Sequence, residues 1–145
     1  MPIRYDQPLM TTRIANSSHG SETVTEGIRV TVTPSYLAAK SDPSAGKYLF
    51  AYSIVIVNEG DRRAKLTKRH WTIVDADGEK NDVRGAGVIG QTPELGPGER
   101  FEYSSFCPIT TPWGTMEGTF ECERDDGTTL SVKVGRFFLV APQLA

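Results

Sequence analysis

Apolar and polar residues alternate along most of the chain between residues 28 and 140. Alternation with a period of two is typical of a β-strand that has one buried and one exposed face. The alternating or apolar segments, separated by stretches rich in Gly, Pro, Asn and Asp, are residues 28–33, 48–57, 66–74, 80–84, 101–106, 116–123 and 130–140. No apolar stripe has the period of a helix. The pattern therefore predicts an all-β fold of seven to eight strands, as an antiparallel sandwich or barrel.

Two of these segments indicate where the core lies. Residues 48–57 read YLFAYSIVIV and are apolar or aromatic on both faces apart from one serine, which predicts a central strand covered on both sides. In the next segment Trp71 shares a face with Ile73, and we predict that Trp71 lies in the core. Cys107 and Cys122 have apolar neighbours in strand-like segments, so we expect buried, unreactive thiols.

The length of 145 residues suits a single domain. Residues 1–25 are rich in Ser, Thr and Asn without a period and predict a flexible N-terminal tail, which leaves residues 26–142 as a single β-sandwich domain. No apolar run approaches the roughly 18 residues of a membrane span, and residues 1–25 lack the apolar segment of a signal peptide. We therefore expect no membrane partner and a cytoplasmic location.

Charge changes this picture little. Lys and Arg number 16 and Asp and Glu number 18, a net charge of −2 that gives no overall attraction to nucleic acid or to anionic membranes. Five cations occur within eight residues, namely Arg62, Arg63, Lys65, Lys68 and Arg69. Strand alternation distributes them over two faces and a turn, which favours a solvated strand edge over a nucleic-acid surface.

The clearest motif is G-x-G-x-x-G at residues 85–90, directly after Arg84. Glycines let a backbone approach phosphates closely and direct its N–H groups at them. The candidate anion-binding residues are Arg84, Gly85, Gly87 and Gly90. Phosphate loops of this kind precede a helix, whereas Pro93 and Pro97 follow here, and Gln91 stands where a P-loop has Lys. The alternative interpretation is a tight crossover with several residues at positive φ.

Catalytic and metal-binding patterns are missing from the sequence. His19 and His70 are the two histidines, no C-x2-C or H-x3-H pair occurs, and no G-x-S-x-G elbow is present. The acidic turn that begins at Asp75 has Gly at its fourth position, whereas a calcium loop of the EF-hand type needs Gly at the sixth. We therefore predict no catalytic residues, no metal site, no cofactor and no enzymatic activity.

Several motifs occur in a fixed order along the chain. They are Phe50-Ala51-Tyr52, His70-Trp71-Thr72-Ile73, the glycine motif with Pro93 and Pro97-Gly98-Glu99 after it, Tyr103-Ser104-Ser105, and the run TPWGTMEG at residues 111–118. Together they give the stretch from Gly27 to Pro142 a resemblance to the ApaG family. His70 stands where the family usually has Tyr, the two residues after the third glycine of the motif differ from the usual ones, and the N-terminal tail is longer.

The resemblance implies a β-sandwich of the immunoglobulin or fibronectin type III kind. Bacterial members of the family are associated with cobalt resistance and magnesium efflux, without an established reaction. Similar domains occur in an F-box protein and in a DNA-polymerase-delta-interacting protein, where a protein-binding role is supposed. The family's gene often neighbours that of a diadenosine tetraphosphatase, which keeps nucleotide phosphates among the candidate ligands.

We therefore hypothesise a non-enzymatic module that binds a partner protein. The alternative hypothesis is a protein that binds phosphate, pyrophosphate or a nucleotide through the glycine motif. Self-association into a homo-oligomer through an exposed sheet edge is compatible with either. Because the residues form no cage for Co²⁺ or Mg²⁺, we expect any metal phenotype to be indirect.

Overall fold

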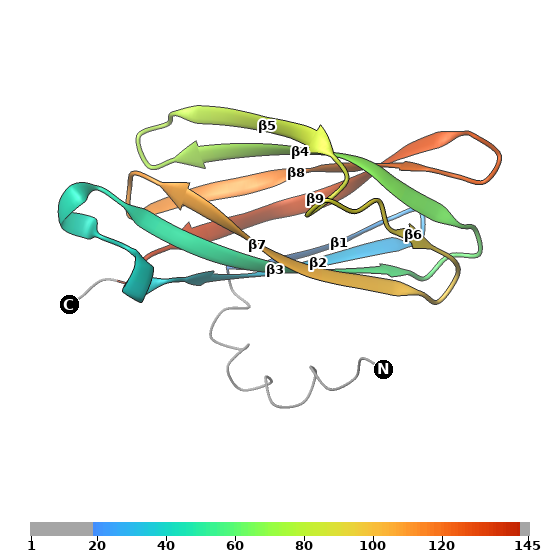
Figure 1. Ribbon diagram of the computed structural model, residues 1–145, viewed down its shortest axis with the longest axis horizontal. Coiled ribbons are helices and arrows are strands. Elements are labelled where there is room, and N and C mark those ends of the chain that lie inside the picture. Colours follow the sequence, from blue (N-terminus) through green and yellow to red (C-terminus); the bar gives the residue numbers. More distant parts are fainter. Residues whose placement is uncertain (1–18, 143–145) are drawn as a thin grey trace, which may run out of the picture.

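Nine strands form two antiparallel sheets in the computed structural model, which describes residues 19–142 (Figure 1). The strands are β1 (Ser21–Thr25), β2 (Ile28–Tyr36), β3 (Tyr48–Asn58), β4 (Ala64–Asp75), β5 (Lys80–Ala86), β6 (Glu94–Leu95), β7 (Arg100–Ile109), β8 (Trp113–Glu123) and β9 (Thr129–Val140). One sheet has the order β1-β2-β3-β7, and the other has the order β5-β4-β8-β9 with β6 also paired to β4. Two short 3-10 helices, η2 (Ala38–Lys40) and η3 (Pro43–Ala45), connect β2 to β3.

The two sheets pack face to face through their apolar sides. In β2 and β9 nearly every second side chain is buried, as the alternating sequence predicts. Trp71 on β4 is only 3% exposed, and its ring meets those of Tyr52, Phe120 and Phe137 at centroid distances of 5.6, 5.8 and 5.9 Å. The predicted all-β sandwich and the predicted core position of Trp71 are therefore confirmed.

Two strands of the structure do not occur among the predicted ones. Strand β6 has two residues, too few to show a period. Strand β1 pairs with β2 from Ser21 to Thr25, so the described part of the predicted tail ends in a strand. Its side chains are mostly polar on both faces, which explains why alternation did not reveal it. The prediction for residues 1–18 lies outside the described residues.

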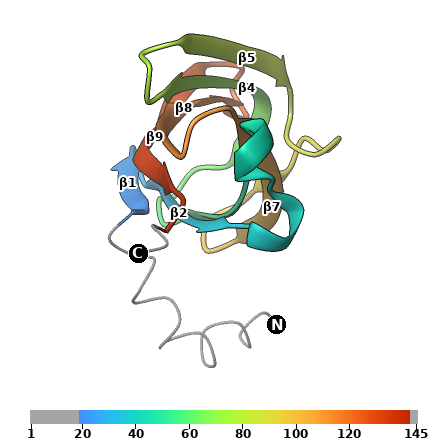
Figure 2. The same ribbon diagram turned by 90° about the vertical axis from the view of Figure 1, so that its left-hand side faces the viewer.

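The sandwich differs between its two lateral sides (Figure 2). On the closed side, β1 of one sheet lies against β9 of the other: Ser21 Oγ donates to the Gly135 carbonyl at 2.8 Å, Thr23 Oγ1 donates to the Lys133 carbonyl at 2.7 Å, and the Lys133 N–H donates to Thr25 Oγ1 at 3.0 Å. On the open side, β5 pairs with β4 and β7 pairs with β3. Among the described residues, no strand pairs with the outer edge of either β5 or β7.

The helical content of residues 19–142 is confined to η2 and η3, and within that range no helix is long and apolar enough to cross a membrane.

Candidate functional site

The glycine motif forms a tight turn at the end of β5. The N–H groups of Val88 and Gln91 each donate to the other residue's carbonyl at 2.8 Å. Between them Ile89 has φ of 41° and Gly90 has φ of 77°, the combination of a type I′ turn. At Gly87 a Cβ would lie 2.1 Å from the Gln91 carbonyl oxygen, so this position needs glycine for close backbone approach.

This turn uses most of its own N–H groups. Besides the Val88 and Gln91 pair, the Gly87 N–H donates to the Thr67 carbonyl at 2.8 Å, and Gly85 lies within the paired part of β5. A phosphate nest needs successive N–H groups that are free to converge on the anion. The geometry thus accounts for the glycines by backbone packing, and anion binding at Gly85, Gly87 and Gly90 stays a prediction.

The fourth predicted residue, Arg84, lies on the outer face of the second sheet. It is opposite His70 in the pairing of β5 with β4. There it lines an open hollow of about 460 Å³ together with Lys68, His70 and Glu121, and Arg69 also reaches this hollow. Arg84 and its strand neighbour Gly85 therefore lie on opposite faces of the sheet.

The opposite, inner face of β4 carries Arg69, which is half-buried and pairs with Gly85. Arg69 Nη1 donates to the Ala86 carbonyl at 3.0 Å and to the Gly87 carbonyl at 2.9 Å. A Cβ on Gly85 would lie 2.7 to 2.9 Å from three atoms of this guanidinium. Gly85 therefore makes room for Arg69, which reaches across β5 and holds the start of the glycine turn.

Arg69 lines a hollow of about 450 Å³ between β5 and β7, which we call the open-side hollow. A volume of this size is typical of sites for small ligands. Its lining residues are Tyr52, Arg69, Trp71, Ile73, Asn81, Asp82, Val83, Ser105, Phe106, Cys107, Pro108 and Met116. Trp71, Cys107 and Met116 are each at most 3% exposed, whereas Phe106 is 62% exposed and Val83 is 40% exposed. The hollow thus has an apolar floor and two exposed apolar residues on its strand edges.

The charge of Arg69 acts on the hydroxyls of two tyrosines. Burial raises the pKa of Tyr52, while a hydrogen bond with Ser105 and the charge of Arg69 oppose the shift. Burial also raises the pKa of Tyr103, and Arg69 again opposes the shift. Tyr103 is buried, with 7% of its surface exposed. Its Oη atom has no hydrogen-bond partner among the described residues.

The thiols of this molecule are not activated. Burial raises the pKa of Cys107 to about 11, and burial likewise raises the pKa of Cys122 to about 11. Both thiols are therefore protonated near neutral pH and are poor nucleophiles. The prediction that both cysteines are buried and free is confirmed.

His70 and Asp82 form a polar pair on the outer face of the second sheet. His70 Nε2 lies 3.0 Å from Asp82 Oδ1, and Thr72 Oγ1 donates to the same oxygen at 2.9 Å. Hydrogen bonds from His70 and Thr72 lower the pKa of Asp82. A hydrolytic triad would need the hydroxyl to bond to the histidine, whereas here both groups bond to the carboxylate. Within residues 19–142 there is also no cluster of three or more His, Cys, Asp or Glu side chains that could hold a metal ion.

Sequence reasoning placed Arg69 among the solvated cations and missed its inward position. Strand alternation contains the necessary signal, because Arg69 is two residues before Trp71 and therefore shares its core face. A cation on the apolar face of a strand is rare unless it is paired.

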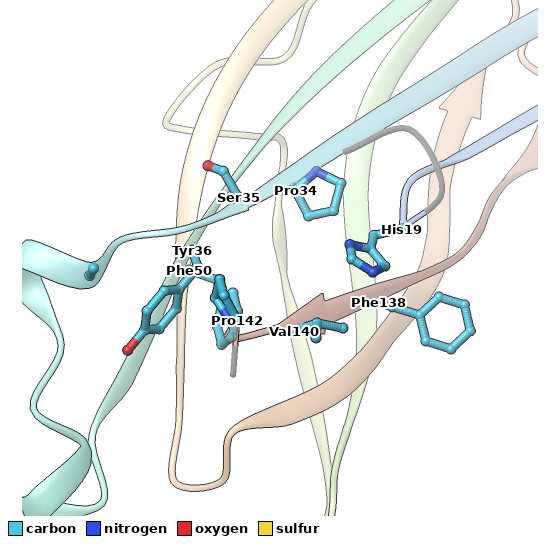
Figure 3. A pocket seen from close by; sticks show the side chains of 9 residues that line it. His19, Pro34, Ser35, Tyr36, Phe50, Phe138, Val140 and Pro142 are labelled. Atoms are coloured by element: carbon cyan, nitrogen blue, oxygen red, sulfur yellow. The ribbon is translucent and has the colours of Figure 1, made fainter. Parts of the chain in front are cut away.

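A third hollow, of about 520 Å³, lies at the closed side where the described chain begins and ends. Figure 3 shows His19 between Pro34 of β2 and Phe138 and Val140 of β9. The Phe138 N–H donates to the His19 carbonyl at 2.8 Å, so the backbone here continues the contact of β1 with β9. Among residues 19–142, the charged or titratable side chains that line this hollow are His19 and Tyr36, and we regard the open-side hollow as the stronger candidate.

Comparisons with known proteins agree with this architecture. Residues 38–124 match the family model described as DUF525, ApaG domain. The chain is 50% identical over 122 residues to Protein ApaG of Anaeromyxobacter dehalogenans strain 2CP-C, covering 84% of this chain and 96% of the relative. It is 46% identical over 116 residues to Protein ApaG of Bordetella pertussis, covering 80% of this chain and 88% of the relative.

Solved structures show the same fold. A crystal structure described as the ApaA protein of Bordetella pertussis superposes with a TM-score of 0.79 at 44% identity, covering 83% of this chain and 99% of that chain. The C-terminal domain of wzt, at 11% identity and a TM-score of 0.55, shares the fold alone.

Proposed function

The chain belongs to the ApaG domain family, and from this premise we propose that it is a non-enzymatic module that binds a partner protein. The relatives named above carry no enzymatic activity in their names. The observation that supports the proposal best is the free edge of β7, where Phe106 is 62% exposed.

The backbone pairing shows which groups of β7 face the free edge. Leu49 of β3 lies opposite Pro108, yet its carbonyl accepts from the Leu37 N–H and its N–H donates to Ser41 Oγ. Leu49 therefore has no ladder bond to β7, and hydrogen-bonded pairs alternate along an antiparallel ladder. It follows that the N–H groups of Ser104 and Phe106 point away from β3.

Such an edge suits an extended segment of another protein. A partner strand added to β7 gains backbone hydrogen bonds from the free N–H and C=O groups, and side-chain contacts provide specificity. Phe106 on β7 and Val83 on β5 supply exposed apolar surface on the two sides of the opening. Pro108 has no N–H, so it limits the pairing at one end of the strand.

Affinity capture with matched variants tests this proposal. Phe106→Lys places a cation on the edge, which disfavours strand addition. Phe138→Lys is the control, because Phe138 is 39% exposed on β9 at the closed side. We expect a specific partner with the parent protein and with Phe138→Lys, and its loss with Phe106→Lys. Circular dichroism and melting curves verify that both variants fold, and equal capture by all three proteins would contradict the role of β7.

Sedimentation of the purified protein distinguishes self-association at this edge from binding of another protein.

Phosphate, pyrophosphate or nucleotide binding by Arg84 and the glycine turn is the alternative function. Arg84 and Lys68 line the same outer hollow, which supports it, but the internal N–H bonds of the turn make it the weaker proposal. Amide shifts of ¹⁵N-labelled protein titrated with pyrophosphate test it, with saturable changes confined to residues 84–92 as the expected result. For cobalt resistance and magnesium efflux we propose an indirect route through the partner protein, since the described residues offer no metal-binding cluster.

A further inference from the structure

We propose that Arg69 makes the open-side hollow a binding site for a carboxylate that is attached to an apolar group, such as the C-terminal residue of a partner chain. The inference deepens the proposed function and rests on it for the identity of the ligand's source. It assigns a chemical class to the ligand and a separate residue to its recognition.

The charge of Arg69 is not neutralised within the described structure. Ion pairs involve Arg29, Arg62, Arg63, Arg100, Arg124 and Arg136, but no carboxylate of residues 19–142 forms an ion pair with Arg69. A half-buried cation without a counter-ion is costly, because the two carbonyl acceptors of Nη1 replace only part of the solvation that burial removes. An anionic ligand would supply the missing partner.

Hydrogen bonds hold the Arg69 guanidinium in one position. Its Nη1 atom donates to the carbonyls of Ala86 and Gly87, so the position of the group is fixed. These bonds use Nη1 and leave Nε and Nη2, and these two atoms carry the parallel N–H groups that bind both oxygens of one carboxylate. The arginine is therefore held in place with its carboxylate-binding edge unoccupied within the described structure.

The open-side hollow that Arg69 lines is formed mostly by apolar residues. Trp71, Met116 and Ile73 form apolar surface in the hollow, where an apolar group of the ligand would pack. The acid in the lining is Asp82, whose Oδ1 is bonded to His70 and Thr72 on the outer face. The charge of Arg69 also acts on Tyr103, whose buried Oη has no hydrogen-bond partner among the described residues.

The same surroundings favour a carboxylate over a phosphate. The carbonyl oxygens of Ala86 and Gly87 lie next to the guanidinium, and they would oppose a second negative charge. The N–H groups of Gly87 and Val88, which a phosphate would need, donate to other carbonyls. A planar acceptor with one charge fits these conditions best.

Fluorescence of Trp71 gives a direct test. In a Trp113→Phe background Trp71 is the single tryptophan, and it lines the hollow. The probe is N-acetylphenylalanine, and N-acetylphenylalaninamide is the neutral control. We expect saturable binding of the acid and at least about tenfold weaker binding of the amide, in line with the loss of a charged hydrogen-bonded pair. Equal affinity for the acid and the amide would overturn the proposal.

Matched variants assign the effect to Arg69. Arg69→Gln should weaken binding of the acid about tenfold or more and leave the amide unchanged, and Arg69→Lys, which keeps the charge but loses the fork, should give a smaller loss. Gly85→Ala should act in the same direction by displacing the guanidinium. Arg84→Gln on the outer face is the control, and we expect its affinity within about twofold of the parent. A loss in Arg84→Gln, or binding of pyrophosphate as tight as that of the acid, would overturn the assignment to Arg69.

A peptide distinguishes the two sources of the carboxylate. If N-acetyl-Thr-Val-Thr-Val-Phe with a free C-terminus binds at least about tenfold more tightly than N-acetylphenylalanine, the β7 edge contributes and the ligand is a chain terminus. Equal affinity supports the carboxylate site with a free small acid as its ligand. Capture that is lost with Phe106→Lys but unaffected by Arg69→Gln would overturn this inference and leave the protein-binding proposal standing. Binding of the acid together with capture that Phe106→Lys leaves unchanged would support the carboxylate site and contradict the role of the β7 edge in the protein-binding proposal.

Discussion

The closed side of the sandwich, where β1 meets β9, and the open side, between β5 and β7, treat their strand edges differently. At the closed side the hydroxyls of Ser21, Thr23 and Thr25 bond to backbone groups of β9, so a short edge strand of one sheet covers the edge of the other. At the open side the edges of β5 and β7 have no strand partner within residues 19–142. Natural proteins usually cover or charge such edges, so an uncovered edge with an exposed phenylalanine is a candidate interaction surface.

The polar groups of the two sides differ in the same way. The closed side joins its two sheets with side-chain hydroxyls that all have partners. The open side contains Arg69 without a carboxylate and Tyr103 Oη without a hydrogen bond in the described structure. Buried polar groups without partners are few in folded proteins and call for an explanation, and ligand binding provides one for this side.

The substitution with the largest expected effect, Trp71→Ala, tests whether the open-side hollow is part of the core between the two sheets. Trp71 lies at the floor of the open-side hollow and packs edge-on against Phe120 and Phe137. Trp71→Ala should lower the free energy of unfolding by about 3–5 kcal/mol, because it leaves a large cavity. Denaturant unfolding measures the loss, and Trp113→Ala, at a tryptophan that is 48% exposed, is the control with a smaller loss. A similar, small loss in both variants would show that the hollow is separate from the core.

The next largest effect concerns the glycine turn beside the open side. Gly87 has φ of 58°, and a Cβ there would lie 2.1 Å from the Gln91 carbonyl oxygen. Gly87→Val should therefore destabilise the fold by about 2 kcal/mol or more, through left-handed strain and a backbone clash. Gly90→Ala, at φ of 77° with no atom within 4 Å of the added Cβ, should cost only about 1 kcal/mol. Thermal melts of the two variants decide the matter, and equal melting temperatures would refute the packing explanation of Gly87.

A matched pair of glycine substitutions compares the two sides directly. At Gly135 on the closed side a Cβ would lie 2.9 Å from Thr23 Cγ2, and at Gly85 on the open side it would meet the flexible end of Arg69. Gly135→Ala should cost about 1–2 kcal/mol by separating β1 from β9, whereas Gly85→Ala should cost less than about 1 kcal/mol. Hydrogen exchange at the Lys133 and Phe138 amides should rise in Gly135→Ala alone. Faster exchange there in Gly85→Ala would show that the two sides are coupled.

The sequence predicts the parts of this fold that depend on local alternation. Strands β2 and β9 follow from it because nearly every second side chain must be apolar in a packed sheet. The continuous apolar run of β3 predicts its strand but not its burial: one face is buried, whereas the other is half-buried or exposed, so the prediction of a strand covered on both sides is wrong. The closed side could not be predicted, since Ser21 and Gly135 are 114 positions apart and the contact uses small polar residues without a pattern. Arg69 was hidden for a different reason. It belongs to a run of cations that is typical of an exposed strand edge. Its inward position becomes clear only from its alternation with Trp71 along β4 and its pairing with Gly85.

The smallest effect concerns the charged rim of the open side and depends on pH. Hydrogen bonds from His70 and Thr72 lower the pKa of Asp82 below its unfolded value of about 3.9. A lowered folded-state pKa stabilises the protein above the unfolded pKa, and this contribution is lost as the pH falls through the folded-state pKa. Asp82→Asn should therefore melt slightly below the parent at pH 7, and the difference should shrink when both are measured near pH 2.5. Because Asp82 is exposed, salt should also reduce the difference at pH 7. A gap that stays constant from pH 7 to the acid limit would assign the loss to altered packing at the rim rather than to the charge of Asp82.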